Sequence, residues 1–347
     1  MKWIGRRMSI GIGIESTRGK LVDPTYWVNA LTFNHEDKVV KARANAGYGG
    51  IWGGSQSLVA QKWAEGDMEI EMGDKSFGTI LHSTFGIVSS VAFSGARKHT
   101  YTLQNDNAHD SISIQTTDPI GDLSFAKAMI ESLAINIVPE DLVKYTVSFR
   151  SEPSLAGSQT ATYSAENKFL GRHLNFKVAA DVDSFSSETV CLKSLTLTIT
   201  KNLEDNYCLG TLIPTDINNK KFEVTGELEL NYEDRTYRDY MLDGDYKALR
   251  IDLVNTDVTI GTTNPAFRID LSKVDFHDWD ADHALDDITS QTLSFTALYD
   301  LDGKDNLFND CYLINEATDY PTSTSTSSTS SSSSSSTSSS TSSSTSA

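Results

Sequence analysis

The sequence predicts a mainly β protein made of two similar β-sandwich domains, each with one short flanking helix, followed by a tail rich in Ser and Thr. Three observations support this fold class. A phrase near the start recurs after the middle of the chain, most apolar segments alternate with a period of two, and every residue from Thr322 to Ser346 is Ser or Thr. With 347 residues, the chain is long enough for two domains that each bury a core.

The recurring phrase is the first of four matching blocks. KWIGRRMSIGI at residues 2–12 aligns with KFLGRHLNFKV at residues 168–178. Three more blocks follow in the same order: NALTF (29–33) with KSLTL (193–197), GDMEIEMGDKSFGTIL (66–81) with GELELNYEDRTYRDYM (226–241), and VSF (147–149) with LSF (293–295). Because the order is kept in all four, we predict an internal duplication.

The duplication sets the expected domain boundaries. We predict a first β domain over residues 1–153 and a second over residues 166–316, joined by a linker at 154–165 that is low in charge. Residues 317–347 form the tail. The tail has too few apolar side chains to offset the entropy of ordering it, so we expect it to be disordered, as a solvated tail or a glycan acceptor.

Each copy contains a strand with one apolar and one acidic face. Apolar residues alternate with Glu69 and Glu71 in the first copy and with Glu229 in the second, which is the period of a half-buried strand. The same alternation predicts later strands in both copies. Their apolar positions are Leu133, Ile135, Ile137, Tyr145, Val147, Phe149, Val274, Phe276, Leu293, Phe295 and Ala297.

A short helix follows this strand in each copy. Asp74 and Asp234 stand where an N-cap is expected, and Gly86 and Gly244 are the expected C-terminal stops. Between them, apolar residues fall on one helical face. These residues are Phe77, Ile80, Leu81 and Phe85 in the first copy, and Tyr237, Tyr240 and Met241 in the second.

Composition and motifs exclude several classes of function. Lys and Arg number 29 against 47 Asp and Glu, and a net charge of −18 disfavours capture of nucleic acid or of an anionic membrane. No secretory signal and no membrane span is visible. The three cysteines Cys191, Cys208 and Cys311 are spaced as free thiols.

Nothing in the sequence suggests catalysis. The segment DWDADHALDDIT at 278–289 lacks the Gly at position 6 and the Glu at position 12 of a calcium loop, so we interpret it as an acidic loop between two strands. No nucleophile motif is present. We therefore expect a protein that is not an enzyme and uses no cofactor and no metal.

The loop GYGGIWGG at residues 47–54 is the least ordinary one. It carries Tyr48 and Trp52 between five glycines. Two interpretations stay open: a simple mobile loop, or an assembly loop that becomes ordered when a partner covers its aromatic side chains.

Three phrases resemble phage tail tube (major tail) proteins. They are KWIGRRMSIGIGIEST with the following Pro24 and Trp27, ENKFLGRHL at 166–174, and YKALRIDLVNTDVTIGTTNP at 246–265. The resemblance covers roughly residues 1–300. It implies a tail-tube-type β-sandwich with a flanking helix, and rings of six such domains whose strands join into an inner β-barrel.

The resemblance also implies the partners and the location. The rings would stack around a tape-measure protein, contact tail-terminator and baseplate or tip proteins, and conduct DNA in passage, with no role for a membrane. The protein would reside in the virion tail after assembly in the host cytoplasm. A virion surface or adhesin-type decoration protein is the alternative, because it would explain the tail and the β content.

The presence of two domains in one chain affects how many chains form a ring. If each domain fills one of six places, three chains make a homotrimeric, pseudo-hexameric ring. The alternative is a homohexamer in which one half lines the lumen. We name Glu69, Glu71, Glu227 and Glu229 as candidate lumen-facing acids, because their neighbours along the strand face a core.

Overall fold

The computed structural model describes residues 2–47, 49–51, 53–107, 109–186, 189–283, 285, 288–301 and 306–320. The first half contains η1 (Gly5–Arg7), β1 (Ser9–Ile14), β2 (Tyr26–Val28), β3 (Ala30–Arg43), β4 (Ser57–Glu71), α1 (Ser76–Phe85), β5 (Gly86–Phe93), β6 (Ala96–Leu103), β7 (Ile112–Thr117), β8 (Leu123–Ile137), β9 (Lys144–Ser151) and β10 (Leu155–Ala156). The second half contains η2 (Gly171–His173), β11 (Leu174–Ala179), β12 (Leu192–Thr200), β13 (Leu203–Asn206), β14 (Asp216–Asn219), β15 (Glu223–Asn231), α2 (Thr236–Asp243), β16 (Lys247–Val254), β17 (Ala266–Asp282), β18 (Ser290–Leu298) and β19 (Phe308–Asn315). The protein is mainly β, as predicted.

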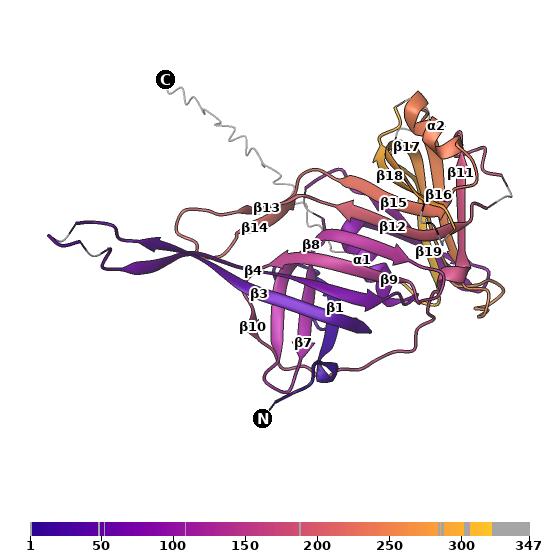
Figure 1. Ribbon diagram of the computed structural model, residues 1–347. Helices are drawn as coiled ribbons and strands as arrows, with labels where there is room; N and C mark the ends of the chain where they lie inside the picture. The colour runs from indigo at the N-terminus through magenta and orange to yellow at the C-terminus, as the bar shows by residue number, and fades with distance from the viewer. Residues whose placement is uncertain are drawn as a thin grey trace, which may run out of the picture.

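A single antiparallel sheet runs through both halves of the chain. Its strands pair in the order β3, β4, β9, β8, β12, β15, β18, β17. We call these strands the central sheet (Figure 1). The long strands β8 and β17 leave this sheet at their N-terminal ends, where β8 pairs with β7 and β10, and β17 pairs with β16 and β19.

The two halves repeat one set of pairings. In the first half β1 pairs with β7, β7 with β8, β8 with β9, β9 with β4 and β4 with β3. In the second half β11, β16, β17, β18, β15 and β12 pair in the same sequence. The addition of β10 to β8 is likewise matched by that of β19 to β17. These matches favour the predicted duplication, which stays a prediction about the origin of the chain.

The register agrees between the halves at single residues. Gly66 lies opposite Phe149 in the first half, and Gly226 lies opposite Phe295 in the second. The pairings of β8 with β9 and of β17 with β18 shift at the corresponding place, between Ile130 and Ser132 and between Phe276 and Asp278 respectively. Shared irregularities of this kind are more specific than shared alternation, because bulges are placed individually.

One block of the sequence alignment needs correction. His35 of β3 lies opposite Gly66, and Leu197 of β12 lies opposite Gly226. Corresponding residues of β3 and β12 are therefore 162 positions apart, whereas the match of NALTF with KSLTL used 164. A slip of two residues keeps every side chain on the same face of a strand, so alternation alone does not detect it.

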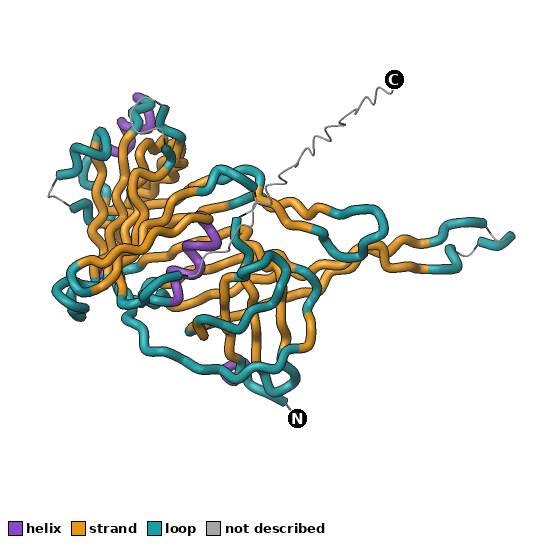
Figure 2. Tube along the Cα trace, turned by 180° about the vertical axis from the view of Figure 1, so that it is seen from behind, coloured by secondary structure: helices purple, strands orange, loops and turns teal. Residues whose placement is uncertain are grey.

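Helix α1 covers the apolar face of the central sheet (Figure 2). Phe77, Ile80, Leu81 and Phe85 are fully buried, as the helical spacing predicts. The helix ends at Gly86, whose φ of 93° is readily reached only by glycine, and α2 ends likewise at Gly244 with φ of 68°.

The expected N-cap of α1 is wrong. The carboxylate of Asp74 accepts hydrogen bonds from the backbone N–H and the side-chain amide of Asn167, at 2.9 and 2.8 Å. The first helical residue, Ser76, instead donates its backbone N–H and its hydroxyl to Glu166, ninety positions later in the chain. In α2 the prediction is closer, because the N–H of Thr236 donates to Asp234 at 2.9 Å.

Two segments are more regular than the sequence suggested. Asp278–Asp282 belong to β17 and pair with β18, so the expected acidic loop begins as a strand. Near the C-terminus, Tyr320 is 1% exposed, and its hydroxyl donates to the carbonyl oxygen of Lys75 at 2.6 Å. The described chain therefore packs on the first half for a few residues beyond 316, where we expected the tail to begin.

The corresponding glycines Gly66 and Gly226 allow a test of how closely the core is packed. A Cβ at Gly226 would lie 2.6 Å from both a ring carbon of Phe295 and the carbonyl oxygen of Thr196. We expect Gly226→Ala to lower the free energy of unfolding by about 1–3 kcal/mol, because overpacking forces the ring to move. Urea denaturation measures this, with exposed Thr225→Ala as the control. Equal stabilities of the two variants would contradict the close approach.

Candidate assembly surface

The face of the central sheet opposite α1 is polar from end to end. Residues directly opposite each other on paired strands share a face, so the face can be followed strand by strand. One row across the sheet contains Glu71, Lys144, Asn136, Thr196, Glu227, Ser294 and Asp278, in that order. The row two residues away contains Glu69, Thr146, Ala134, Thr198, Thr225 and Thr296. We call this surface the polar face.

The four candidate acids lie on this surface in two pairs, one on β4 and one on β15, with β9, β8 and β12 between them. Glu71 and Glu227 belong to the first row, Glu69 belongs to the second, and Glu229 is two residues along β15 from Glu227. Their neighbours Met68, Ile70, Leu228 and Leu230 are buried on the opposite face. The sequence pattern thus identified a common face for residues from both halves of the chain.

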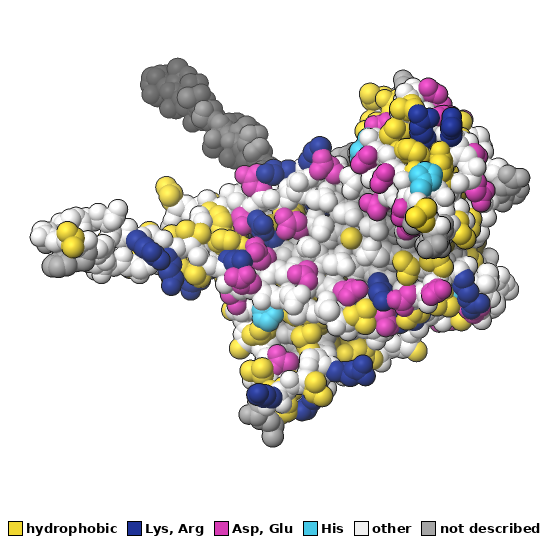
Figure 3. Space-filling view, viewed as in Figure 1, with side chains coloured by type: hydrophobic (Ala, Val, Ile, Leu, Met, Phe, Trp, Pro, Cys, Tyr) yellow, Lys and Arg dark blue, Asp and Glu magenta, His cyan; other side chains and the backbone are white. Residues whose placement is uncertain are grey.

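Acidic and uncharged polar side chains dominate the polar face (Figure 3). The few cations on it are engaged with acids. Lys168 lies 3.7 Å from Glu71, and the Nζ of Lys144 donates to Asp141. The hydrogen bond with Asp141 is the main reason that the pKa of Lys144 is raised above its ordinary value. The face therefore has few free positive charges to hold a phosphate.

The central sheet has two edges that other strands can join. At one end β3 pairs with β4. At the other end, residues Asp275–Asp282 of β17 pair with β18. Within the described residues, the second edge of each of these segments has no strand partner. Unpaired edges of this length present rows of N–H and C=O groups to other chains.

The two halves meet at a strand pair inside the central sheet. Residues 132–137 of β8 pair with residues 195–200 of β12, so that Ala134 lies opposite Thr198 and Asn136 opposite Thr196. On the polar face the facing side chains are uncharged, and the hydroxyl of Thr196 donates to the Asn136 amide oxygen at 3.1 Å. The buried face of the same pair joins Leu133 to Ile199. We call this pair the internal junction.

The edge residues were not identified from the sequence. On the β3 edge, Lys38 donates to Glu36 at 2.6 Å and lies 3.2 Å from Glu65. These two hydrogen bonds raise the pKa of Lys38 above its ordinary value. On the β17 edge, Asp278 and Asp280 are exposed. The β17 edge could have been identified from the segment DFHDWDAD at 275–282, because its alternation has the period of a strand.

The hairpin of β3 and β4 extends well beyond the rest of the sheet (Figure 1). Its outer part, residues 38–62, is called the arm. Exposed apolar side chains lie along it: Val39 (47%), Val40 (43%), Leu58 (65%) and Val59 (37%). The N–H of Lys62 donates to the carbonyl oxygen of Leu212, at the base of the arm. The candidate loop residues Tyr48 and Trp52 lie outside the described residues.

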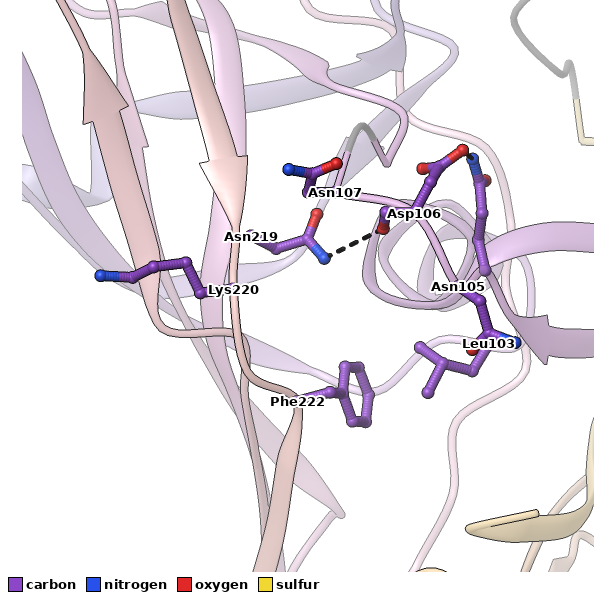
Figure 4. Close-up of a pocket in the computed structure, with 8 residues that line it drawn as sticks. Leu103, Asn105, Asp106, Asn107, Asn219, Lys220 and Phe222 are labelled. Carbon is purple, nitrogen blue, oxygen red and sulfur yellow. Dashed lines mark hydrogen bonds between the residues drawn. The ribbon is translucent and has the colours of Figure 1, made fainter. Parts of the chain in front are cut away.

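A pocket lies where the β6–β7 connection meets the β14–β15 connection (Figure 4). Its volume is about 380 Å³, and Asn219 donates from its side chain to the carbonyl oxygen of Asp106 at 3.4 Å. Lys220 lies 3.1 Å from Glu204. Among the described residues, the lining contains no Ser, Thr, Cys or His.

In the part of the chain that the structure describes, no group of three or more His, Cys, Asp and Glu side chains is arranged to hold a metal ion. Neither α1 nor α2 is long and apolar enough to cross a bilayer.

Comparison with known proteins gives a family match. The family model described as "Phage tail tube protein" matches residues 5–297, which is most of the chain and includes both halves. No curated protein matches the chain.

Proposed function

The chain belongs to the phage tail tube protein family, and from that premise we propose that its copies close into rings that stack into the hollow tail tube through which the genome is delivered. The observation that carries this proposal is the internal junction. It joins the two halves edge to edge through β8 and β12, and the corresponding strands β17 and β3 have free edges in the described chain.

The ring that this arrangement favours contains three chains. The two halves have the same strand pairings, so each can fill one of six similar places around a lumen. Repeating the junction between chains would leave no strand edge open around the ring. A true hexamer would require the two similar halves to take different positions, and it is the alternative.

The polar face is the surface that we propose for the lumen. Glu69, Glu71, Glu227 and Glu229 would then line the channel. Carboxylates repel the phosphates of DNA. The surrounding Ser and Thr side chains are uncharged, so they do not attract the phosphates either. The opposite face is covered by α1 and its apolar side chains are buried, so it is already used as a core.

The arm is the element that we propose for contact between stacked rings. It extends out of the sheet and carries apolar side chains that a neighbouring subunit would cover. Tyr48 and Trp52, which lie between β3 and β4 in the sequence, stay the candidate residues for that contact. A tape-measure protein inside the lumen, and terminator and baseplate or tip proteins at the two ends, complete the proposed set of partners. The assembled protein would reside in the virion tail after assembly in the host cytoplasm.

Imaging of the purified protein tests this function directly. We expect negative-stain images at high protein concentration to show rings or tubes with a central channel. A decoration protein would instead stay monomeric or form closed oligomers without a channel. Monomer alone across a wide range of concentrations and ionic strengths would contradict the tube function.

The lumen assignment predicts an effect on DNA passage. Phage carrying Glu69→Lys, Glu71→Lys, Glu227→Lys and Glu229→Lys together should eject DNA about tenfold more slowly, because cations in the channel attract phosphates. The matched control replaces the same four residues with Gln, which removes charge without adding attraction. Ejection kinetics that the four Lys substitutions leave unchanged would exclude these residues from the lumen.

A further inference from the structure

The internal junction predicts which residues meet between chains. Ala134 of β8 lies opposite Thr146 of β9, and in the second half Asp280 of β17 holds the same place opposite Thr292 of β18. Asp280 is therefore the counterpart of Ala134.

The partner strand is matched in the same way. Thr198 of β12 lies opposite Thr225 of β15, and Glu36 of β3 lies opposite Glu65 of β4. Glu36 is the counterpart of Thr198, and Ala134 and Thr198 face each other in the internal junction. Copying that register places Asp280 of one chain opposite Glu36 of the next.

The two junctions differ in charge. In the internal junction the polar face holds three uncharged pairs, namely Ser132 with Thr200, Ala134 with Thr198, and Asn136 with Thr196. The corresponding pairs between chains are Asp278 with Lys38, Asp280 with Glu36, and Asp282 with Asn34.

Lys38 offsets only part of this negative charge. Its one positive charge is shared between Glu36 and Glu65 of its own chain, and its place in the copied register is opposite a further acid, Asp278. Asn34 likewise donates to Asp67 at 3.0 Å, which adds another carboxylate beside the β3 edge. Three acids of β17 would therefore approach residues 34–38 of β3, where Lys38 is the one lysine and where Glu36, with Glu65 and Asp67 of the neighbouring β4, supplies three carboxylates. Like charges directly opposite on paired strands are destabilising.

We propose that the junction between chains pairs β17 with β3 in this register, and that the facing carboxylates of Asp280 and Glu36 hold back ring closure until their repulsion is screened or neutralised. The inference rests on the proposed tube function. It assigns opposite roles to the two junctions: the internal junction forms unhindered as the chain folds, and the junction between chains is the electrostatically controlled step of assembly.

Charge exchange tests the facing pair. Asp280→Lys should place a cation opposite Glu36 and strengthen each junction by about threefold. Over three junctions the trimerisation constant would rise by about thirtyfold, so the protein concentration of half-maximal assembly should fall by about fivefold. Adding Glu36→Lys to Asp280→Lys restores like charges and should remove that gain. The control is Glu140→Lys, which makes the same change of charge at an exposed loop residue away from both edges.

Salt provides a second measurement on the same variants. Raising the salt concentration should promote assembly of the unaltered protein, because screening shortens the range of the repulsion to about 10 Å at 0.1 M. The Asp280→Lys variant should gain less from salt than Glu140→Lys. An equal effect of Asp280→Lys and Glu140→Lys, or a double variant that keeps the gain, would overturn the proposal.

Disulfide cross-linking tests the register. His35 and Ala281 face each other in the copied register, one position along from the carboxylate pair, so His35→Cys with Ala281→Cys should link chains into covalent trimers. The exposed Cys191 and Cys208 are first replaced by Ser, whereas Cys311 is buried. Asp37→Cys with Ala281→Cys is the control, displaced by two residues.

The outcomes separate this inference from the tube function. Rings that form without the His35–Ala281 cross-link, or that cross-link better through Asp37, would overturn the register and leave the tube function standing. The absence of rings from the unaltered protein and from all variants would overturn both.

Discussion

Replacing Ala281 with proline is expected to abolish ring formation without unfolding the chain. The N–H of Ala281 donates to the carboxylate of Asp280 at 2.9 Å, so we assign it to the edge of β17 that has no strand partner in the described chain. Proline removes that donor and fills the space beside it, which a joining strand needs. With one lost backbone bond and one steric conflict at every junction, we expect at least about a hundredfold loss of assembly.

Ala281→Val is the matched control for this substitution, because valine keeps the N–H and favours strands. Analytical ultracentrifugation measures assembly, and urea denaturation measures the stability of the single chain. We expect the proline variant to stay monomeric with a free energy of unfolding within about 0.5 kcal/mol of the control, because Ala281 is only half-buried and lies one residue before the end of β17. Rings from the proline variant would show that β17 does not form the junction.

The second large effect concerns the packing between the halves. Phe77 of α1 is fully buried, and its ring centroid lies 4.9 Å from that of Tyr145 and 5.2 Å from that of Phe267. Tyr145 belongs to the first half and Phe267 to the second, so one side chain packs against both. We expect Phe77→Ala to lower the free energy of unfolding by about 3–5 kcal/mol, through lost burial and the cavity left behind.

Urea denaturation followed by far-UV circular dichroism measures this loss. The control is Leu242→Ala in α2, where the side chain is 58% exposed and we expect a change of about 0.5 kcal/mol or less. A loss below about 1 kcal/mol for Phe77→Ala would show that the halves do not depend on this contact.

Much of the architecture could be predicted from the sequence, because burial has a local period. The alternation that identified Leu133, Ile135, Tyr145 and Val147 is borne out by full or nearly full burial of each residue. The common face of Glu69 and Glu227 also followed from alternation within their own strands. Apolar pattern determines which way a side chain points, since successive residues of a strand face opposite sides.

Strand partners could not be predicted in the same way. Pairing of β8 with β12 depends on a contact between segments about sixty residues apart, and alternating strands are similar in pattern. The capping of α1 by Glu166 is a long-range contact of the same kind. Asp74 was chosen only because an acidic residue directly before a helix is a common N-cap. The burial of Tyr320 was not predicted, because Tyr320 lies next to the Ser/Thr tract and the composition of that segment suggested disorder.

The internal junction links the fold to the function. A chain that contains one complete example of a strand pair shows what a second example between chains would require: two free edges, a fixed register and compatible faces. The family match supports a structural role in a phage tail, and the pairings of β17 and β3 indicate where the contacts between subunits would lie.

The number of chains in a ring tests the central claim most directly. Native mass spectrometry of isolated rings, with image averaging of the same sample, measures it. The account predicts three chains of 38.0 kDa each, arranged as six similar lobes around one channel. A ring of six chains would contradict it, because the two halves would then occupy different positions and the internal junction would not be repeated between subunits.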